Sequence, residues 1–187
     1  MVLTAGDIMS FRRKPAAAAA ATRADHREAF LAYLLPVKKH LYNFIRKALN
    51  FSHDADDIFQ DALLKGFRYF HSFDRRKNFK TWIFTIAHNL MKDNFREKGH
   101  HTYPVSLQEV GDISAEGAPA GMTEKVQEIY AAAANLKPRQ REVFFLYYYN
   151  EFGVSEVAEI TGLTRANTKF ILHQARNTIK TVMEVPA

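Results

Sequence analysis

The chain has 187 residues, of which 47% are hydrophobic and 25% charged, which is enough for one or two globular domains with real cores. No run approaches the ~20 apolar residues of a membrane span, and the lack of cysteine excludes disulfides, thiolate zinc sites and cysteine nucleophiles. A net charge of +6 and a pI of about 9.5 favour an anionic partner, and a cysteine-free chain fits the cytoplasm.

The first 25 residues combine the basic triplet Arg12-Arg13-Lys14 with a run of six alanines at positions 16–21. This arrangement superficially resembles a secretory signal, but the alanine run is too short and too weakly apolar for one. Short isolated helices are marginal in water even when they are rich in alanine. We therefore expect residues 1–25 to form a disordered or frayed tail.

Residues 26–98 carry apolar side chains at helical spacing and are expected to form an all-α domain. From His26 the spacing predicts a core helix or a bent pair, with Pro36 as the break or kink. A second helix is expected to begin with Ser52 as its cap, with carboxylates in its first turn, where the helix dipole favours anions. A third helix is expected from Phe79 to about Lys98, before Gly99.

Residues 99–122 contain four of the eight glycines and two of the six prolines, and show no sustained period. They carry acidic residues and no lysine or arginine, so this segment is poorly suited to lie on DNA phosphates. We expect an acidic linker here, which places a domain boundary between residues 98 and 123.

Residues 123–187 predict a second helical domain that ends in a helix-turn-helix. Pro138 is expected to open one helix, and Gly162 to permit the tight turn between the last two. Thr164 is suited to cap the final helix, and Leu172 to hold it against the core. The other side chains of that helix remain available to a major groove: Arg165, Asn167, Lys169, Phe170, His173 and Gln174.

The final helix has four basic residues and no acidic one between Thr164 and Lys180. This asymmetry favours DNA binding over the alternative, a basic face that is merely solvated. A second cationic and aromatic group, around Trp82 in residues 73–98, has the composition needed to stack unpaired bases and follow phosphates. Rings at helical spacing are more often buried in a core, so for each single ring that alternative stays open.

Two motifs make the chain similar to bacterial RNA polymerase sigma factors of the extracytoplasmic-function (ECF) group, within the sigma-70 family. The first comprises Asp54-Ala-Asp-Asp-Ile-Phe-Gln-Asp-Ala-Leu-Leu-Lys-Gly-Phe and Phe79-Lys-Thr-Trp-Ile-Phe-Thr-Ile-Ala-His-Asn. The second comprises Leu136-Lys-Pro-Arg-Gln-Arg-Glu-Val-Phe and the helix-turn-helix that follows. They resemble sigma regions 2 and 4, and together they cover roughly residues 26–98 and 123–181.

The resemblance implies a role in transcription initiation for each set of residues. Docking on the clamp helices of the largest polymerase subunit is implied for Asp56, Asp57, Gln60 and Asp61. Capture and melting of the minus-10 element is implied for Phe73, Phe79, Lys80, Trp82, Thr85, Asn89, Lys92 and Arg96. Reading of the minus-35 element is implied for Arg165, Asn167, Lys169, Phe170, His173, Gln174 and Arg176.

The resemblance also implies core RNA polymerase and promoter DNA as partners, and makes an inhibitory anti-sigma factor a reasonable third. The acidic linker would pass through polymerase channels that otherwise hold nucleic acid. The sequence departs from the family pattern at Thr85, where a basic residue is common, and at Phe170 and Ile171, where small and basic residues are common. The promoter sequence therefore does not follow from the resemblance.

Two other classes of protein were weighed against a sigma factor. An enzyme is disfavoured because the sequence has no His-Glu-x-x-His motif, and Phe59 and Lys65 stand where a calcium-binding loop needs glycine and an acid. We expect no catalytic residue, cofactor or metal site. A stand-alone helix-turn-helix regulator would leave the motif in residues 54–96 without a function.

Overall fold

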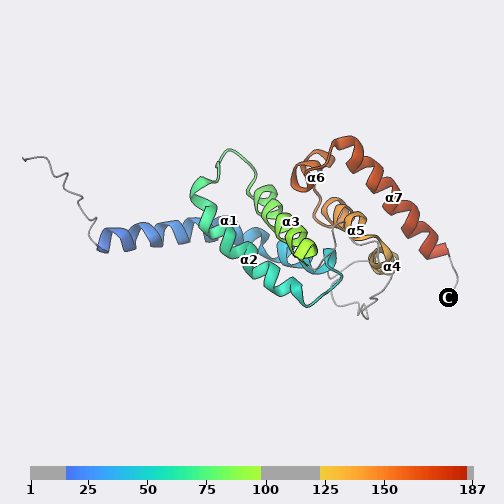
Figure 1. Cartoon of the computed structure of the whole chain (residues 1–187), viewed down its shortest axis with the longest axis horizontal. Helices are drawn as coiled ribbons and strands as arrows, with labels where there is room; N and C mark the ends of the chain where they lie inside the picture. The colour runs from blue at the N-terminus through green and yellow to red at the C-terminus, as the bar shows by residue number, and fades with distance from the viewer. Residues whose placement is uncertain (1–15, 98–122, 185–187) are drawn as a thin grey trace, which may run out of the picture.

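The computed structural model describes residues 16–97 and 123–184, and the side chains of 25–97 and 123–184. All regular elements within these ranges are helical. Figure 1 shows that α1, α2 and α3 form one group and that α4 to α7 form a second group beside it. The expected all-α fold with two small domains is confirmed, while the expected linker at 99–122 lies outside the described residues.

Helix α1 runs from Ala16 to Ala48, so it begins ten residues before His26. Residues 16–25, expected to belong to a disordered or frayed tail, are therefore helical, and residues 1–15 lie outside the described part. Alanine has the highest helix propensity, and a segment continuous with a packed helix avoids the cost of nucleation. The first part of α1 projects away from the rest of its domain (Figure 1).

The helix α1 continues unbroken across Pro36, so of the two expected alternatives the structure has a single core helix and not a pair broken at this residue. Proline removes a backbone donor, and its ring crowds the carbonyl four residues earlier, at Ala32. Both Ala32 and Pro36 are exposed, so water can reach the free carbonyl. On the opposite face the side chains of Leu41, Phe44 and Ile45 are completely buried, which holds the helix in place.

Helix α2 (Asp54–Tyr69) and helix α3 (Phe79–Glu97) pack against each other and against α1. Gly66 marks their closest approach, because a Cβ atom there would lie 2.6 Å from Cδ1 of Ile83. The expected cap of α2 is wrong, since the residue before the helix is His53 and Ser52 lies one position too early. The hydroxyl of Ser52 instead donates to the Asp54 carboxylate at 3.5 Å.

The second domain begins with α4 (Glu124–Ala132) and the short helix η2 (Ala133–Asn135). Its core is then formed by α5 (Pro138–Phe144), η3 (Phe145–Tyr149), α6 (Val154–Thr161) and α7 (Arg165–Glu184). Pro138 occupies the first helical position, as expected. Helix η3 is a π-helix, a feature that the sequence did not predict and that often marks functional sites.

Candidate nucleic-acid interface

The turn between α6 and α7 has the geometry of a DNA-binding helix-turn-helix. Gly162 has a φ of +67°, a left-handed conformation that an L-residue adopts only with strain. The Thr164 hydroxyl accepts the backbone N–H of Asn167 at 3.1 Å and so caps α7. Val157 and Ile160 are buried beneath the turn, and Leu172 anchors α7 from the other side.

The seven residues expected to read the minus-35 element all lie on α7, and all seven are exposed. Three of them have neighbours in the protein. Gln174 accepts a hydrogen bond from Gln140 at 3.3 Å, Arg176 donates to the Tyr148 hydroxyl at 3.2 Å, and His173 lies 3.1 Å from the Asn177 amide. These contacts are at the surface, so the side chains remain free to exchange them for DNA.

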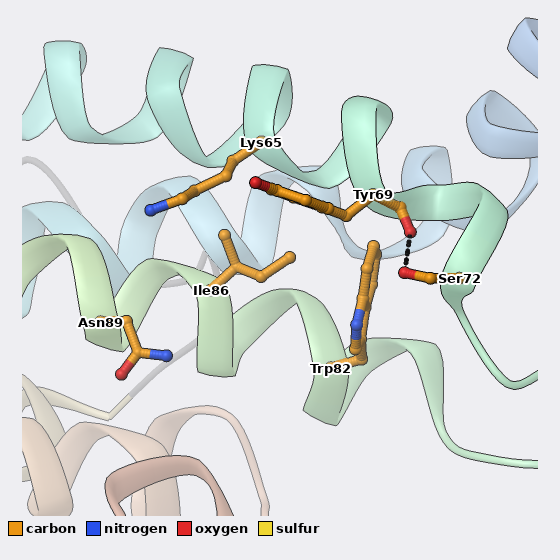
Figure 2. A pocket seen from close by; sticks show the side chains of 6 residues that line it. All are labelled: Lys65, Tyr69, Ser72, Trp82, Ile86 and Asn89. Carbon is orange, nitrogen blue, oxygen red and sulfur yellow. Dashed lines mark hydrogen bonds between the residues drawn. The ribbon is translucent and has the colours of Figure 1, made fainter.

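A pocket lies between α2 and α3 and brings together two residues expected to contact the minus-10 element. Figure 2 shows Trp82 and Asn89 on α3 with Ile86 between them, opposite Lys65 and Tyr69 on α2. Ser72 closes one end, where its hydroxyl donates to the Tyr69 carbonyl at 2.7 Å. The volume is about 300 Å³, at the small end of the range for ligand pockets. The lining offers aromatic, cationic and amide groups.

The loop between α2 and α3 buries the two phenylalanines that were expected to take part in melting. Phe73 and Phe79 are each only 6% exposed. Their rings pack edge to face with each other at 5.5 Å, and both lie beside Trp82, at 5.0 and 5.4 Å. In this arrangement they hold the Trp82 indole at the pocket and offer no stacking face of their own.

The remaining residues of the minus-10 set are divided between two sides of α3. Lys92 and Arg96 are exposed on the turns that follow Asn89. Thr85 donates its hydroxyl back to the Thr81 carbonyl at 2.9 Å, within its own helix. Lys80 points away from the pocket toward the second domain, so the structure does not bring it together with the others.

Several residues of this interface were missed by the sequence analysis. Lys65 and Tyr69, four positions apart on α2, are two of the six residues that line the pocket, as Figure 2 shows. The exposed cations Arg75, Arg76 and Lys77 occupy the adjoining loop. Three consecutive cations could have been recognised from the sequence. The contribution of Lys65 and Tyr69 could not, because only the packing of α2 on α3 places them at the pocket.

The acidic residues of α2 lie in the first half of the helix, before the pocket residues Lys65 and Tyr69. Its expected polymerase contacts, Asp56, Asp57, Gln60 and Asp61, are all exposed. Asp56 accepts a hydrogen bond from the Tyr42 hydroxyl at 2.9 Å. Leu64, one turn beyond Gln60, is 66% exposed and adds an apolar side chain to an otherwise acidic surface.

The two domains are joined by polar contacts, one of which comes from Arg141 on α5. This side chain is buried, and it donates to the carbonyls of Ala48 in the first domain and of Ala134 and Leu136 in its own. The distances are 3.0, 3.1 and 3.3 Å. Burial lowers the pKa of Arg141 to about 10, so the guanidinium remains charged near neutral pH.

Helix α3 also contacts the second domain. His88 on α3 pairs with Glu142 on α5 at 2.5 Å, and both side chains are buried. The Lys80 ammonium donates to the Asn150 carbonyl at 2.6 Å and lies 4.5 Å from the centre of the Phe152 ring. Burial lowers the pKa of Lys80, and the nearby Glu151 and Glu156 oppose that shift.

Lys47 on α1 is enclosed by aromatic rings from both domains. Its ammonium lies 5.2 to 5.9 Å from the ring centres of Phe51, Tyr130, Phe145 and Tyr149. Tyr149 is also held by the Asn43 amide, which donates to its hydroxyl at 2.9 Å. Burial, with a smaller contribution from Arg46, lowers the pKa of Lys47. These contacts and those of Arg141, His88 and Lys80 are together called the domain interface below.

The fold consists of two helical domains, with an exposed helix-turn-helix in the second and a pocket between α2 and α3 in the first. Comparison with known families gives the class more narrowly. The family model described as "Sigma-70 region 2" matches residues 30–101, and "Sigma-70, region 4" matches residues 126–179. The chain belongs to the sigma-70 family and, by its relatives, to the ECF group.

Curated relatives carry the same description. The "ECF RNA polymerase sigma factor SigM" of Bacillus subtilis is 28% identical over 144 residues, covering 75% of this chain and 86% of the relative. SigW of the same organism, also described as an ECF RNA polymerase sigma factor, is 27% identical over 154 residues, covering 76% and 82%.

Solved structures agree with the fold. The sigma factor RpoE of Bartonella quintana, solved with the anti-sigma factor NepR, is 26% identical with a TM-score of 0.69. The match covers 86% of this chain and 99% of that one. CnrH, solved with the cytosolic domain of CnrY, shares the fold with a TM-score of 0.63 at 19% identity. Separately, none of the described helices has the length and apolar character of a membrane span.

Proposed function

We propose that this sigma factor binds core RNA polymerase and directs it to promoters by gripping two DNA elements, one with each domain. The observation that carries the proposal is the pairing of an exposed reading helix, α7, with a base-sized pocket between α2 and α3. A stand-alone helix-turn-helix regulator is not favoured, because region 2 would then have no task. We propose that the chain acts as an initiation factor in the cytoplasm and not as an enzyme.

The pocket would capture one flipped base of the minus-10 element. An unpaired base can stack on the half-exposed Trp82 ring, while the Asn89 amide hydrogen-bonds its edge. Lys65 lies on the opposite wall, where its ammonium can reach the phosphate of the same nucleotide. Lys92, Arg96 and the loop cations would follow the strand on either side. Melting would then be driven by binding energy for the unpaired strand.

The acidic face of α2 would dock on a basic surface of the polymerase clamp. Asp57→Lys reverses a charge at an exposed position, so it should weaken binding to core polymerase without unfolding the domain. Glu28→Lys is a matched control, because Glu28 is an exposed acid on α1, outside this face. Equal polymerase affinity of the two variants would contradict the docking assignment.

Copurification with core polymerase and run-off transcription in vitro test the proposed function as a whole. We expect the purified chain to bind core polymerase and to start transcription at a defined site on a matched promoter. A chain that binds specific duplex DNA by itself but does neither of these would be a regulator. An anti-sigma factor remains a proposed partner, to be sought by capture with the full chain.

A further inference from the structure

The exposed side chains of α7 are sorted by chemistry around the helix. The buried row consists of Thr168, Leu172, Ala175 and Ile179. The basic residues Arg165, Lys169, Arg176 and Lys180 are spaced by four, seven and four positions, so they form one row on the flank beside it. The side opposite the buried row carries the uncharged residues Asn167, Phe170, Gln174 and Asn177, with His173 next to the basic row.

Phe170 lies at the centre of this uncharged side and is 59% exposed. No ring-stacking or cation–π contact involves it among the residues that the structure describes. Its neighbours along the face, Asn167, His173 and Gln174, are polar and exposed. An isolated apolar ring on the outward face of a reading helix has one apolar group to meet in a major groove, the C5-methyl of thymine.

We propose that Phe170 is a specificity-determining residue of α7 and selects a thymine in the minus-35 element through its C5-methyl group. The basic row would contact phosphates of one strand and carry no base preference. This inference rests on the proposed function, because it assumes that α7 lies in the major groove of promoter DNA. It divides the exposed residues of α7 into one that reads a methyl group and four that position the helix.

Replacing thymine by deoxyuridine removes only the methyl group and therefore isolates this contact. The full chain bound to core polymerase first selects its minus-35 sequence from a pool randomised at that element. Duplexes are then made with one thymine at a time replaced by deoxyuridine. We expect one replacement to weaken binding about fourfold, the effect of one buried methyl group. At the same position, 5-methylcytosine should bind more tightly than cytosine.

Substitutions on α7 then assign the effect to a side chain. Phe170→Ala should bind the thymine and deoxyuridine duplexes equally and, being at an exposed position, should fold normally. Lys169→Gln is the matched control on the basic row. It should weaken binding to all duplexes alike, reduce the salt dependence of log K by about 1, and keep the preference for thymine.

Two results would overturn the inference while leaving the proposed function intact. One is an active holoenzyme for which no deoxyuridine replacement matters, and the other is a Phe170→Ala variant that retains the thymine preference. Loss of core polymerase binding in Phe170→Ala without DNA would show that Phe170 meets protein instead, and would also overturn it. A chain that directs no initiation at all would refute the proposed function and, with it, this assignment.

Discussion

At the scale of single residues, Gly162 shows how one backbone angle sets the geometry of the reading helix. Its φ of +67° costs an L-residue about 1–2 kcal/mol, although the space around it is open. We expect Gly162→Ala to lower the free energy of unfolding by about that amount, as measured by urea denaturation. Gly153→Ala is the control for the added methyl group, since φ there is −64° and alanine adopts this angle without strain. Equal losses would argue against backbone strain.

The buried Arg141 is a second residue whose chemistry can be tested. Its guanidinium satisfies three carbonyl groups, and a lysine ammonium cannot reproduce that planar arrangement. Leaving even one buried carbonyl without a donor costs about 1–3 kcal/mol, so we expect Arg141→Lys to destabilise the chain by at least that much. Arg68→Lys, on the exposed surface of α2, should leave the unfolding free energy unchanged. If Arg141→Lys unfolds at the same urea concentration as the wild-type chain, this role is contradicted.

Local signals in the sequence predicted Gly162, Thr164 and Pro138 correctly, because each acts on backbone within three positions of itself. The roles of Phe73 and Phe79 were harder to predict. Their composition fits either stacking on bases or burial, and only the packing of α2 on α3 decides in favour of burial. Their predicted part in melting stays a prediction, since they can still contribute by positioning Trp82.

At the scale of elements, α1 carries an internal proline that its fold tolerates. Pro36 is exposed and its helix is unbroken, so the cost of the missing hydrogen bond is not offset by a special contact there. A proline in a helix interior costs about 3 kcal/mol, and its stiffening of the unfolded chain returns up to about 1 kcal/mol. We expect Pro36→Ala to raise the unfolding free energy by about 1–2 kcal/mol in urea titrations. Lys38→Ala should change it little, and a less stable Pro36→Ala would show that the proline is needed.

The π-helix η3 is an element that no local pattern predicted. Its aromatic run, Phe145 to Tyr149, fits an ordinary helix equally well. The π conformation allows consecutive tyrosines to contact different helices. Tyr149 contacts Asn43 on α1, and Tyr148 contacts Arg176 on α7. Such contacts join positions far apart in the chain, which is why periodicity could not reveal them.

At the scale of the whole molecule, the two domains lie too close together, while the domain interface is formed, to bind both promoter elements at once. Elements centred at minus 10 and minus 35 are about 85 Å apart at about 3.4 Å per base pair. Lys80 lies two positions before Trp82 of the pocket, and its ammonium donates to the carbonyl of Asn150, which closely precedes α6. Helices α6 and α7, with 8 and 20 residues, are about 12 and 30 Å long, so together they extend the reach from Asn150 by less than the distance between the two elements. Residues 98–122 can span about 85 Å when extended, so the chain can reach both elements only after the domains separate.

Opening of the domain interface should therefore accompany promoter binding, and the buried His88–Glu142 pair offers a way to shift it. His88→Ala removes one hydrogen bond to the buried Glu142 carboxylate across the two domains, and a hydrogen bond to a charged group contributes about 1.5–3 kcal/mol. Because the closed form loses this contribution, the variant should populate the open form without DNA. The cysteine-free chain allows spin labels to be placed at introduced cysteines, Lys38→Cys on α1 and Thr181→Cys on α7.

We expect the distance between the two labels to be longer in His88→Ala than in the wild-type chain, and longest when polymerase and promoter DNA are added. Arg96→Ala is the control, because it removes an exposed ion pair with Asp93 within a single domain and should not change the distance. Separation would also release Lys80 from Asn150, which makes its ammonium available to the minus-10 strand. If the label distance in the promoter complex equals that in the free wild-type chain, both elements are bound by the closed form. The spacing argument would then be wrong.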